Sequence, residues 1–135
     1  MSYNKFLGQL VEAGNVDQIK HYLDLYAQAY LIRLIFKYSH NKSRTSSPKL
    51  IPGAPAFTRL FLNRSLTPEE KGFVFEALVG KCLLEHFEEV YYWREGKYEV
   101  DFVVLLEGKT IGIEVKSKMR TASGIAPFRE KFTKS

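Results

Sequence analysis

The residues best suited to chemistry are two carboxylates and a lysine in the C-terminal half of the chain. Asp101 is followed, after a turn, by Glu114 and Lys116, which are separated by a single residue. Carboxylate oxygens are ligands that Mg²⁺ prefers, and a bound metal polarises a phosphate and acidifies a water. A neighbouring lysine can stabilise developing negative charge. The set suits metal-assisted phosphodiester hydrolysis, although a half-solvated sheet face with ordinary surface charges would carry the same residue types.

A third carboxylate, Glu76, lies within the apolar stripe of a predicted helix. Its neighbours on the helical face lack polar side chains: Gly72, Phe73, Val79, Gly80 and Leu83. Because an unpaired carboxylate on a packed face is costly, Glu76 needs a metal, a hydrogen-bond partner or a cation. It either joins Asp101 and Glu114 as a metal ligand or forms a buried ion pair with an arginine or lysine, Lys116 included. Gly72 and Gly80 would let a sheet approach the helix closely.

Three apolar runs within residues 91–116 predict an antiparallel meander, because two glycine-containing turns separate them. Strict alternation along the second strand predicts one apolar face, made of Tyr98, Val100, Phe102 and Val104. Glu99 and Asp101 would share the opposite face, with Glu99 as an alternate ligand. On the third strand Glu114 and Lys116 lie opposite the apolar residues. Pairing of the two strands would then bring Asp101, Glu114 and Lys116 together.

Helix signals stand on both sides of this meander. Thr67, Pro68 and Glu70 combine a capping hydroxyl, a proline at the first helical position and a glutamate that can bond back to the cap. They predict a helix over residues 68–87. The basic run 117–124 is predicted to be a loop, and residues 125–132 a short helix. Together these elements predict an α/β core.

The N-terminal part of the chain predicts a second, smaller unit. Hydrophobic spacing and breakers predict helices over 2–13, 16–30 and 55–62 and strands over 31–38 and 48–51. Asn15 is the expected cap of the second helix. Two helices followed by a hairpin have the outline of a winged helix. A boundary near Asn63 would divide the chain into a winged-helix-like α+β segment, 1–62, and the core, 63–135.

The charge distribution favours a polyanionic partner such as DNA. The formal net charge is +5, and no acidic residue occurs between Asp24 and Glu69. Such a one-signed stretch attracts phosphates, although a solubilising loop would also be basic. The residues predicted to bind nucleic acid are Lys37, Lys42, Arg44, Lys49, Lys118 and Arg120.

The carboxylate and lysine pattern resembles the PD-(D/E)XK nuclease signature, with Glu99-Val100-Asp101 in place of Pro-Asp and Glu114-Val115-Lys116 as the second half. More narrowly, the chain resembles a C-terminal domain of uncharacterised function that follows an AAA-type ATPase module in many prokaryotic proteins. That resemblance rests on four motifs: Gly72-x-x-Phe75-Glu76, Tyr92-Trp93-Arg94, Glu99-Val100-Asp101-Phe102 and Ile113-Glu114-Val115-Lys116-Ser117.

The resemblance implies a restriction-endonuclease-like core, a helix plus a three-stranded meander in a mixed sheet. It implies that Glu76, Asp101, Glu114 and Lys116 are catalytic and that the three acids hold Mg²⁺ or Mn²⁺. Lys116 would act through its charge rather than as a general base. In such folds a further strand usually follows the last helix. The end of the chain at Ser135 therefore predicts a truncated core, whose open sheet edge favours a homo-oligomer.

The expected activity is that of a Mg²⁺-dependent deoxyribonuclease associated with an ATPase partner. The chain has no phosphate-binding Gly-x-x-x-x-Gly-Lys-Ser/Thr motif, so it has no predicted ATP site of its own. A single cysteine, Cys82, excludes an internal disulfide, and no apolar run is long enough for a membrane span. A cytoplasmic location is expected. The alternative is a noncatalytic DNA-binding or ATPase-docking regulatory module on a nuclease-like scaffold.

Overall fold

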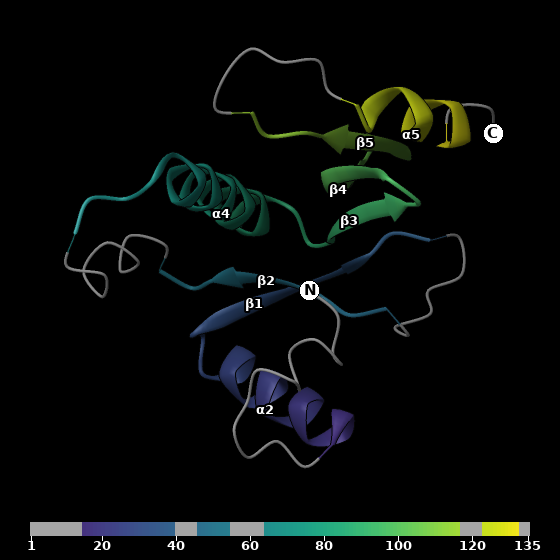
Figure 1. Ribbon diagram of the computed structural model, residues 1–135. Helices are drawn as coiled ribbons and strands as arrows, with labels where there is room; N and C mark the ends of the chain where they lie inside the picture. Colours follow the sequence, from purple (N-terminus) through teal and green to yellow (C-terminus); the bar gives the residue numbers. More distant parts are fainter. Residues whose placement is uncertain (1–14, 40–45, 55–63, 117–122, 133–135) are drawn as a thin grey trace.

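The computed structural model describes residues 15–39, 46–54, 64–116 and 123–132. These residues form a mixed α/β structure in which a five-stranded sheet has the order β2-β1-β3-β4-β5 (Figure 1). The predicted helices over 2–13 and 55–62 lie outside the described residues, and so does most of the predicted loop at 117–124. None of the described helices has the length and apolar character needed to cross a bilayer.

Three helices are described, and each begins close to its predicted start. Helix α2 spans Val16–Gln28, and the Asn15 side chain caps it by accepting from the Gln18 N–H. Helix α4 spans Pro68–His86 and has the predicted capping box between Thr67 and Glu70. Helix α5 spans Ile125–Phe132. Local capping and breaker signals therefore located these helices correctly.

The C-terminal strands form the predicted antiparallel meander. Strand β3 spans Val90–Glu95, β4 spans Tyr98–Leu106 and β5 spans Lys109–Ile113. Strand β4 pairs with both neighbours in antiparallel orientation. The turns between them place Gly96 and Gly108 at positive φ, a region that glycine enters without steric cost. The two predicted hairpins are therefore confirmed.

The N-terminal strands extend the same sheet. Strand β1 spans Ile32–Lys37 and β2 spans Lys49–Pro52, and the two form an antiparallel pair. Strand β1 also pairs with β3 in parallel, with Phe36 opposite Tyr91. The chain passes through α4 between β2 and β3. Strands from both sides of the predicted boundary near residue 62 therefore belong to one mixed sheet.

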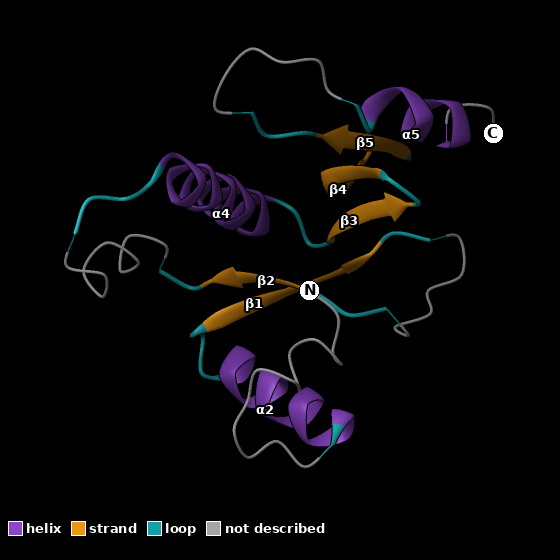
Figure 2. Cartoon of the chain, in the orientation of Figure 1, coloured by secondary structure: helices purple, strands orange, loops and turns teal. Residues whose placement is uncertain are grey.

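Each face of the sheet carries its own apolar cluster. The first contains Ala77 of α4 and residues of four strands: Ile35, Ile51, Val90, Tyr92, Phe102 and Val104. The second contains Phe128 of α5 together with Trp93, Val100 and Val103. Helix α2 lies beside β1, whereas α5 lies beside β4 and β5 (Figure 2). Helices α4 and α5 therefore cover opposite faces.

A β-bulge changes the predicted faces of β4. The pairs Tyr91 with Val103 and Trp93 with Val100 show that β4 advances three residues while β3 advances two. The extra residue breaks the strict alternation of side chains. Val100 consequently packs with Trp93, whereas Phe102 and Val104 lie in the other cluster. The prediction that Val100 shares a face with Phe102 and Val104 was wrong, because it assumed an unbroken strand.

Candidate carboxylate and lysine site

The four residues predicted to be catalytic come together in the structure. Lys116 Nζ lies 2.5 Å from Glu114 Oε1. That hydrogen bond raises the pKa of Lys116 above its usual value, and the charges of Glu114, Asp101 and Glu76 act in the same direction against partial burial. The ammonium of Lys116 therefore stays protonated at neutral pH and is attracted by all three predicted acids. Glu114 and Lys116 are therefore in contact, and Asp101 and Glu76 lie close enough for their charges to act on the Lys116 ammonium.

A second lysine, Lys49 of β2, lies between the acids. Its Nζ forms an ion pair with Glu76 Oε1 and lies 3.5 Å from Asp101 Oδ1. It is also 3.4 Å from the Asp101 carbonyl oxygen and 3.9 Å from Glu99 Oε1. The cation that Glu76 required is therefore Lys49, not Lys116. Lys49 was predicted as a nucleic-acid contact, but its ammonium is directed at carboxylates and only 20% of its side chain is exposed.

The position of Lys49 follows from the packing of β2. Lys49 is opposite Ile35 in the β1 and β2 pair, and the following Ile51 is buried under α4. The hydroxyl of Tyr92 donates to the carbonyl of Ser47 at 2.8 Å, which ties the chain just before β2 to β3. The ammonium lies 5.1 Å from the centre of the Phe102 ring. Backbone pairing and this side-chain anchor together hold the lysine at the acids.

Asp101 is fixed through both carboxylate oxygens. Oδ1 is close to Lys49, and Oδ2 accepts a 2.8 Å hydrogen bond from the Val115 N–H. Strand β5 ends at Ile113, so the Asp101 side chain supplies an acceptor to the chain just beyond the paired residues. The bulge in β4 lies next to Asp101, where such an irregularity can redirect a side chain. Asp101 therefore links β2, β4 and the segment that carries Glu114.

Glu76 depends on the close approach of α4 to the sheet. Gly80, one turn after Glu76, is buried, and a Cβ built there would lie 2.8 Å from the Phe102 ring and 3.3 Å from Ile51. Gly80 therefore permits the contact that the sequence predicted. Around Gly72, by contrast, no atom of the described residues lies within 4 Å of an added Cβ. The prediction that Gly72 also allows close packing was wrong, because that turn of α4 lies beyond the sheet contact.

Glu114 is the most enclosed acid of the group. Only 5% of its side chain is exposed, and Oε1 accepts the contact from Lys116. Its other oxygen, Oε2, is buried and has no hydrogen-bond partner among the described residues. A buried carboxylate oxygen without a donor is costly and is a natural position for a bound cation. Glu99 differs, because its Oε2 is already paired with Arg94 at 2.5 Å.

The fit of a divalent metal depends on Lys49. Three clustered carboxylates, one with an unpartnered oxygen, have the donor chemistry that Mg²⁺ or Mn²⁺ requires. In the described part of the chain, however, no three His, Cys, Asp or Glu side chains are arranged to hold a metal ion. Lys49 lies between Glu76 and Asp101 and offers them a positive charge. Lys49 therefore occupies the space between Glu76 and Asp101, and metal binding by these acids stays a prediction.

The remaining predicted nucleic-acid contacts are located only in part. Lys37 lies at the end of β1 and is half-buried. Lys42, Arg44, Lys118 and Arg120 lie outside the described residues. The proposed phosphate-binding role of these residues stays a prediction.

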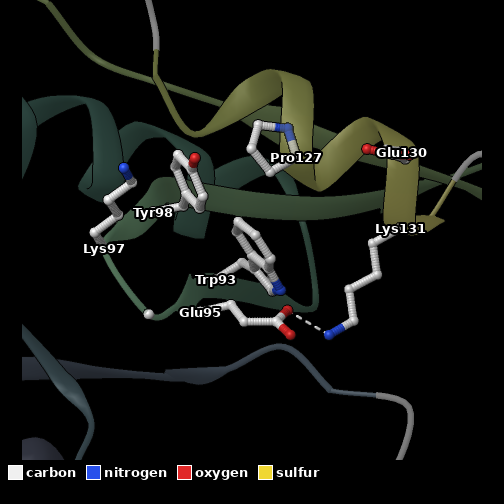
Figure 3. A pocket seen from close by; sticks show the side chains of 8 residues that line it. Trp93, Glu95, Lys97, Tyr98, Pro127, Glu130 and Lys131 are labelled. Atoms are coloured by element: carbon white, nitrogen blue, oxygen red, sulfur yellow. Dashed lines mark hydrogen bonds and ion pairs between the residues drawn. The ribbon is translucent and has the colours of Figure 1, made fainter.

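A separate pocket of about 540 Å³ lies between the β3–β4 turn and α5 (Figure 3). Trp93 and Tyr98 line it from the strands, and Pro127 lines it from the helix. An ion pair between Lys131 and Glu95 joins its two sides. None of the predicted catalytic residues lines this pocket, so it is distinct from the carboxylate and lysine site.

A comparison with protein families gives a match in the C-terminal half of the chain. No curated protein and no solved structure matches the chain. One protein-family model covers residues 71–134, a range that begins in α4 and includes Glu76, Asp101, Glu114 and Lys116 but leaves out Lys49. The part of the chain that carries all four predicted catalytic residues thus matches the domain of unknown function DUF4143.

Proposed function

We propose that the chain is a Mg²⁺-dependent, DNA-hydrolysing domain with a PD-(D/E)XK-like site. The observation that supports this proposal best is the meeting of Glu76 from α4, Asp101 from β4, and Glu114 with Lys116 from the segment after β5. Clustered carboxylates repel one another unless cations compensate them. A divalent cation would compensate these acids and, together with Lys116, would attract the negative charge of a phosphodiester.

Each side chain has a role that follows from its contacts. A Mg²⁺ ion held by Glu76, Asp101 and Glu114 would polarise the phosphate and acidify a water. Asp101 is oriented by the Val115 N–H, so its carboxylate keeps one direction. Lys116 remains charged beside Glu114 and would stabilise negative charge on the phosphate. Glu114 offers the buried oxygen that no other described group uses.

The partners in this proposal are DNA and an ATPase. The net charge of +5 favours a polyanion. The resemblance to a domain that follows AAA-type ATPase modules suggests an ATPase partner, because this chain has no phosphate-binding loop motif of its own. Nucleotide hydrolysis would then be supplied from outside this chain and coupled to its handling of DNA.

The test is plasmid nicking over a magnesium titration. We expect the unaltered protein to nick DNA, and we expect Glu114→Gln and Lys116→Met to lose at least about 100-fold of the rate, because each removes a group that touches the reacting phosphate or its metal. Lys81→Met is the matched control, since Lys81 is exposed on α4 and pairs only with Glu85 among the described residues. Equal background cleavage by all four proteins would refute the proposal.

A second candidate function is noncatalytic binding of DNA or an ATPase on the same scaffold. Lys49 favours it, because an ammonium between Glu76 and Asp101 neutralises the acids without any metal. This candidate predicts DNA binding that weakens with salt, since each phosphate contact releases counterions. Absence of nicking, combined with a steep dependence of DNA affinity on salt, would favour it. A flat salt dependence, or no loss on neutralising Lys42 and Arg44, would exclude phosphate binding by the basic segment.

A further inference from the structure

We propose that Lys49 is an internal counter-ion that a divalent metal must displace, so that this lysine sets the metal affinity of the site. The inference rests on the proposed metal-dependent function and adds a residue that lies outside the nuclease-like signature. The ammonium of Lys49 contacts Glu76 and Asp101 and lies 3.9 Å from Glu99. It therefore takes the position between acids that a metal would otherwise occupy.

The two cations exclude each other for reasons of charge and space. A divalent ion shared by Glu76 and Asp101 would lie within a few ångströms of Lys49 Nζ, where the two positive charges repel strongly in a partly buried site. Only 20% of the Lys49 side chain is exposed, compared with 39% for that of Lys116. Lys49 is thus the more enclosed of the two lysines, and metal entry requires its long stem to turn toward solvent.

Glu114 has a buried carboxylate oxygen whose desolvation a bound cation would offset. Both lysines are present, yet the buried Oε2 of Glu114 has no hydrogen-bond partner among the described residues. If the two ammonium groups were the only intended counter-ions, a carboxylate with 95% of its surface covered would be expected to use both oxygens. The unused oxygen is therefore available to the metal that the proposed function assigns to Glu114.

The first experiment measures Mn²⁺ binding by calorimetry to the full chain and to its variants. Lys49→Met removes the competing charge and keeps a long apolar stem, so its Kd for Mn²⁺ should fall by at least about tenfold. Lys49→Arg keeps the positive charge and should not bind more tightly than the unaltered protein. Lys81→Met, the same change at an exposed lysine of α4, should leave the Kd unchanged.

A melting-temperature measurement adds a readout that does not depend on activity. Without metal, Lys49→Met should melt below the unaltered protein, because Glu76 and Asp101 lose their shared counter-ion. Saturating Mn²⁺ should raise its melting temperature more than that of the unaltered protein, since a ligand that binds only the folded state stabilises it.

A further measurement uses the unaltered protein, so the proposal can be tested even if Lys49→Met does not fold. Reductive methylation at low extent, read by mass spectrometry, reports how accessible each lysine amine is. If the ammonium leaves the acids, Mn²⁺ should increase the modification of Lys49 at least about threefold relative to that of Lys81. A sodium salt at the same ionic strength, without Mn²⁺, should not increase it. Unchanged modification of Lys49 at saturating Mn²⁺ would overturn the proposal.

The outcomes separate this inference from the proposed function. Equal Mn²⁺ affinity in the unaltered protein and Lys49→Met, together with magnesium-dependent nicking, would reject the role of Lys49 and leave the nuclease proposal standing. No Mn²⁺ binding to either protein would reject both. Tighter binding by Lys49→Met without any nicking would support the counter-ion role and reject catalysis.

Discussion

Lys49 shows what a sequence pattern misses at the level of a single residue. Asp101, Glu114 and Lys116 stand out because strand spacing joins them, and Glu76 stands out because it interrupts an apolar stripe. Lys49 has neither signal, and it was grouped with the basic residues around it. The sequence indicated that Glu76 needs a cation, but no local pattern connected that need with Lys49, because the two residues lie on different elements that only the folded sheet brings together.

Asp101 gives a prediction at the same scale. Asp101→Asn removes the charge that Lys49 contacts and turns one anchored oxygen into an amide donor. We expect a loss of about 1–3 kcal/mol in the free energy of unfolding, because Lys49 loses the negative charge and one of the two donors then faces an amide NH2 group instead of an oxygen. Urea denaturation measures it. Glu99→Gln is the control, since this more exposed acid should cost less than about 1 kcal/mol. Equal effects of the two changes would contradict the anchored role of Asp101.

At the scale of secondary structure, local signals located the elements correctly, whereas the predicted faces of β4 were wrong. Capping residues located α2 and α4, and glycine turns located the meander, because these signals act within a few residues. The bulge in β4 has no comparable local signal, so Val100 was assigned to the wrong face. The same irregularity lies beside Asp101, which means that the site is built where simple alternation fails.

The contact of α4 with the sheet predicts opposite effects at two glycines. Gly80→Ala should destabilise the protein by about 1–3 kcal/mol, because the added methyl group meets the Phe102 ring at 2.8 Å. Gly72→Ala should be neutral or stabilise by up to about 1 kcal/mol, because space is open there and alanine favours helix. Chemical denaturation of both variants measures this difference. Similar losses at the two positions would show that α4 does not approach the sheet as described.

The first turn of α4 predicts a pH effect. Hydrogen bonds from Arg64 and from the Thr67 N–H lower the pKa of Glu70 to about 2. Since the folded pKa lies below the usual value of 4.5, the stabilising contribution of Glu70 is complete above about pH 5 and is lost as the pH falls toward 2. The melting temperature of the unaltered protein should therefore exceed that of Glu70→Gln at pH 7, and the gap should narrow below pH 4. A gap independent of pH would contradict this ion pair.

At the scale of the whole molecule, the order of the sheet was the least predictable feature. The pairing of β1 with β3 joins residues more than fifty positions apart, and no turn or capping signal reports it. The sequence therefore indicated two adjacent units, whereas the structure joins their strands into one mixed sheet. The same long-range pairing brings Lys49 to Glu76 and Asp101, which explains why the acids could be predicted and their counter-ion could not.

The parallel pairing of β1 with β3 also limits where the chain can be truncated for experiments. A fragment limited to residues 71–134, the range of the family match, would keep every predicted catalytic side chain. It would also strip two strands from the sheet, expose the backbone of β3, and uncover the apolar surface that Ile35 and Ile51 bury. Truncation to residues 71–134 should therefore yield a poorly folded polypeptide that aggregates. Inactivity of that fragment would say nothing about the activity of the full chain.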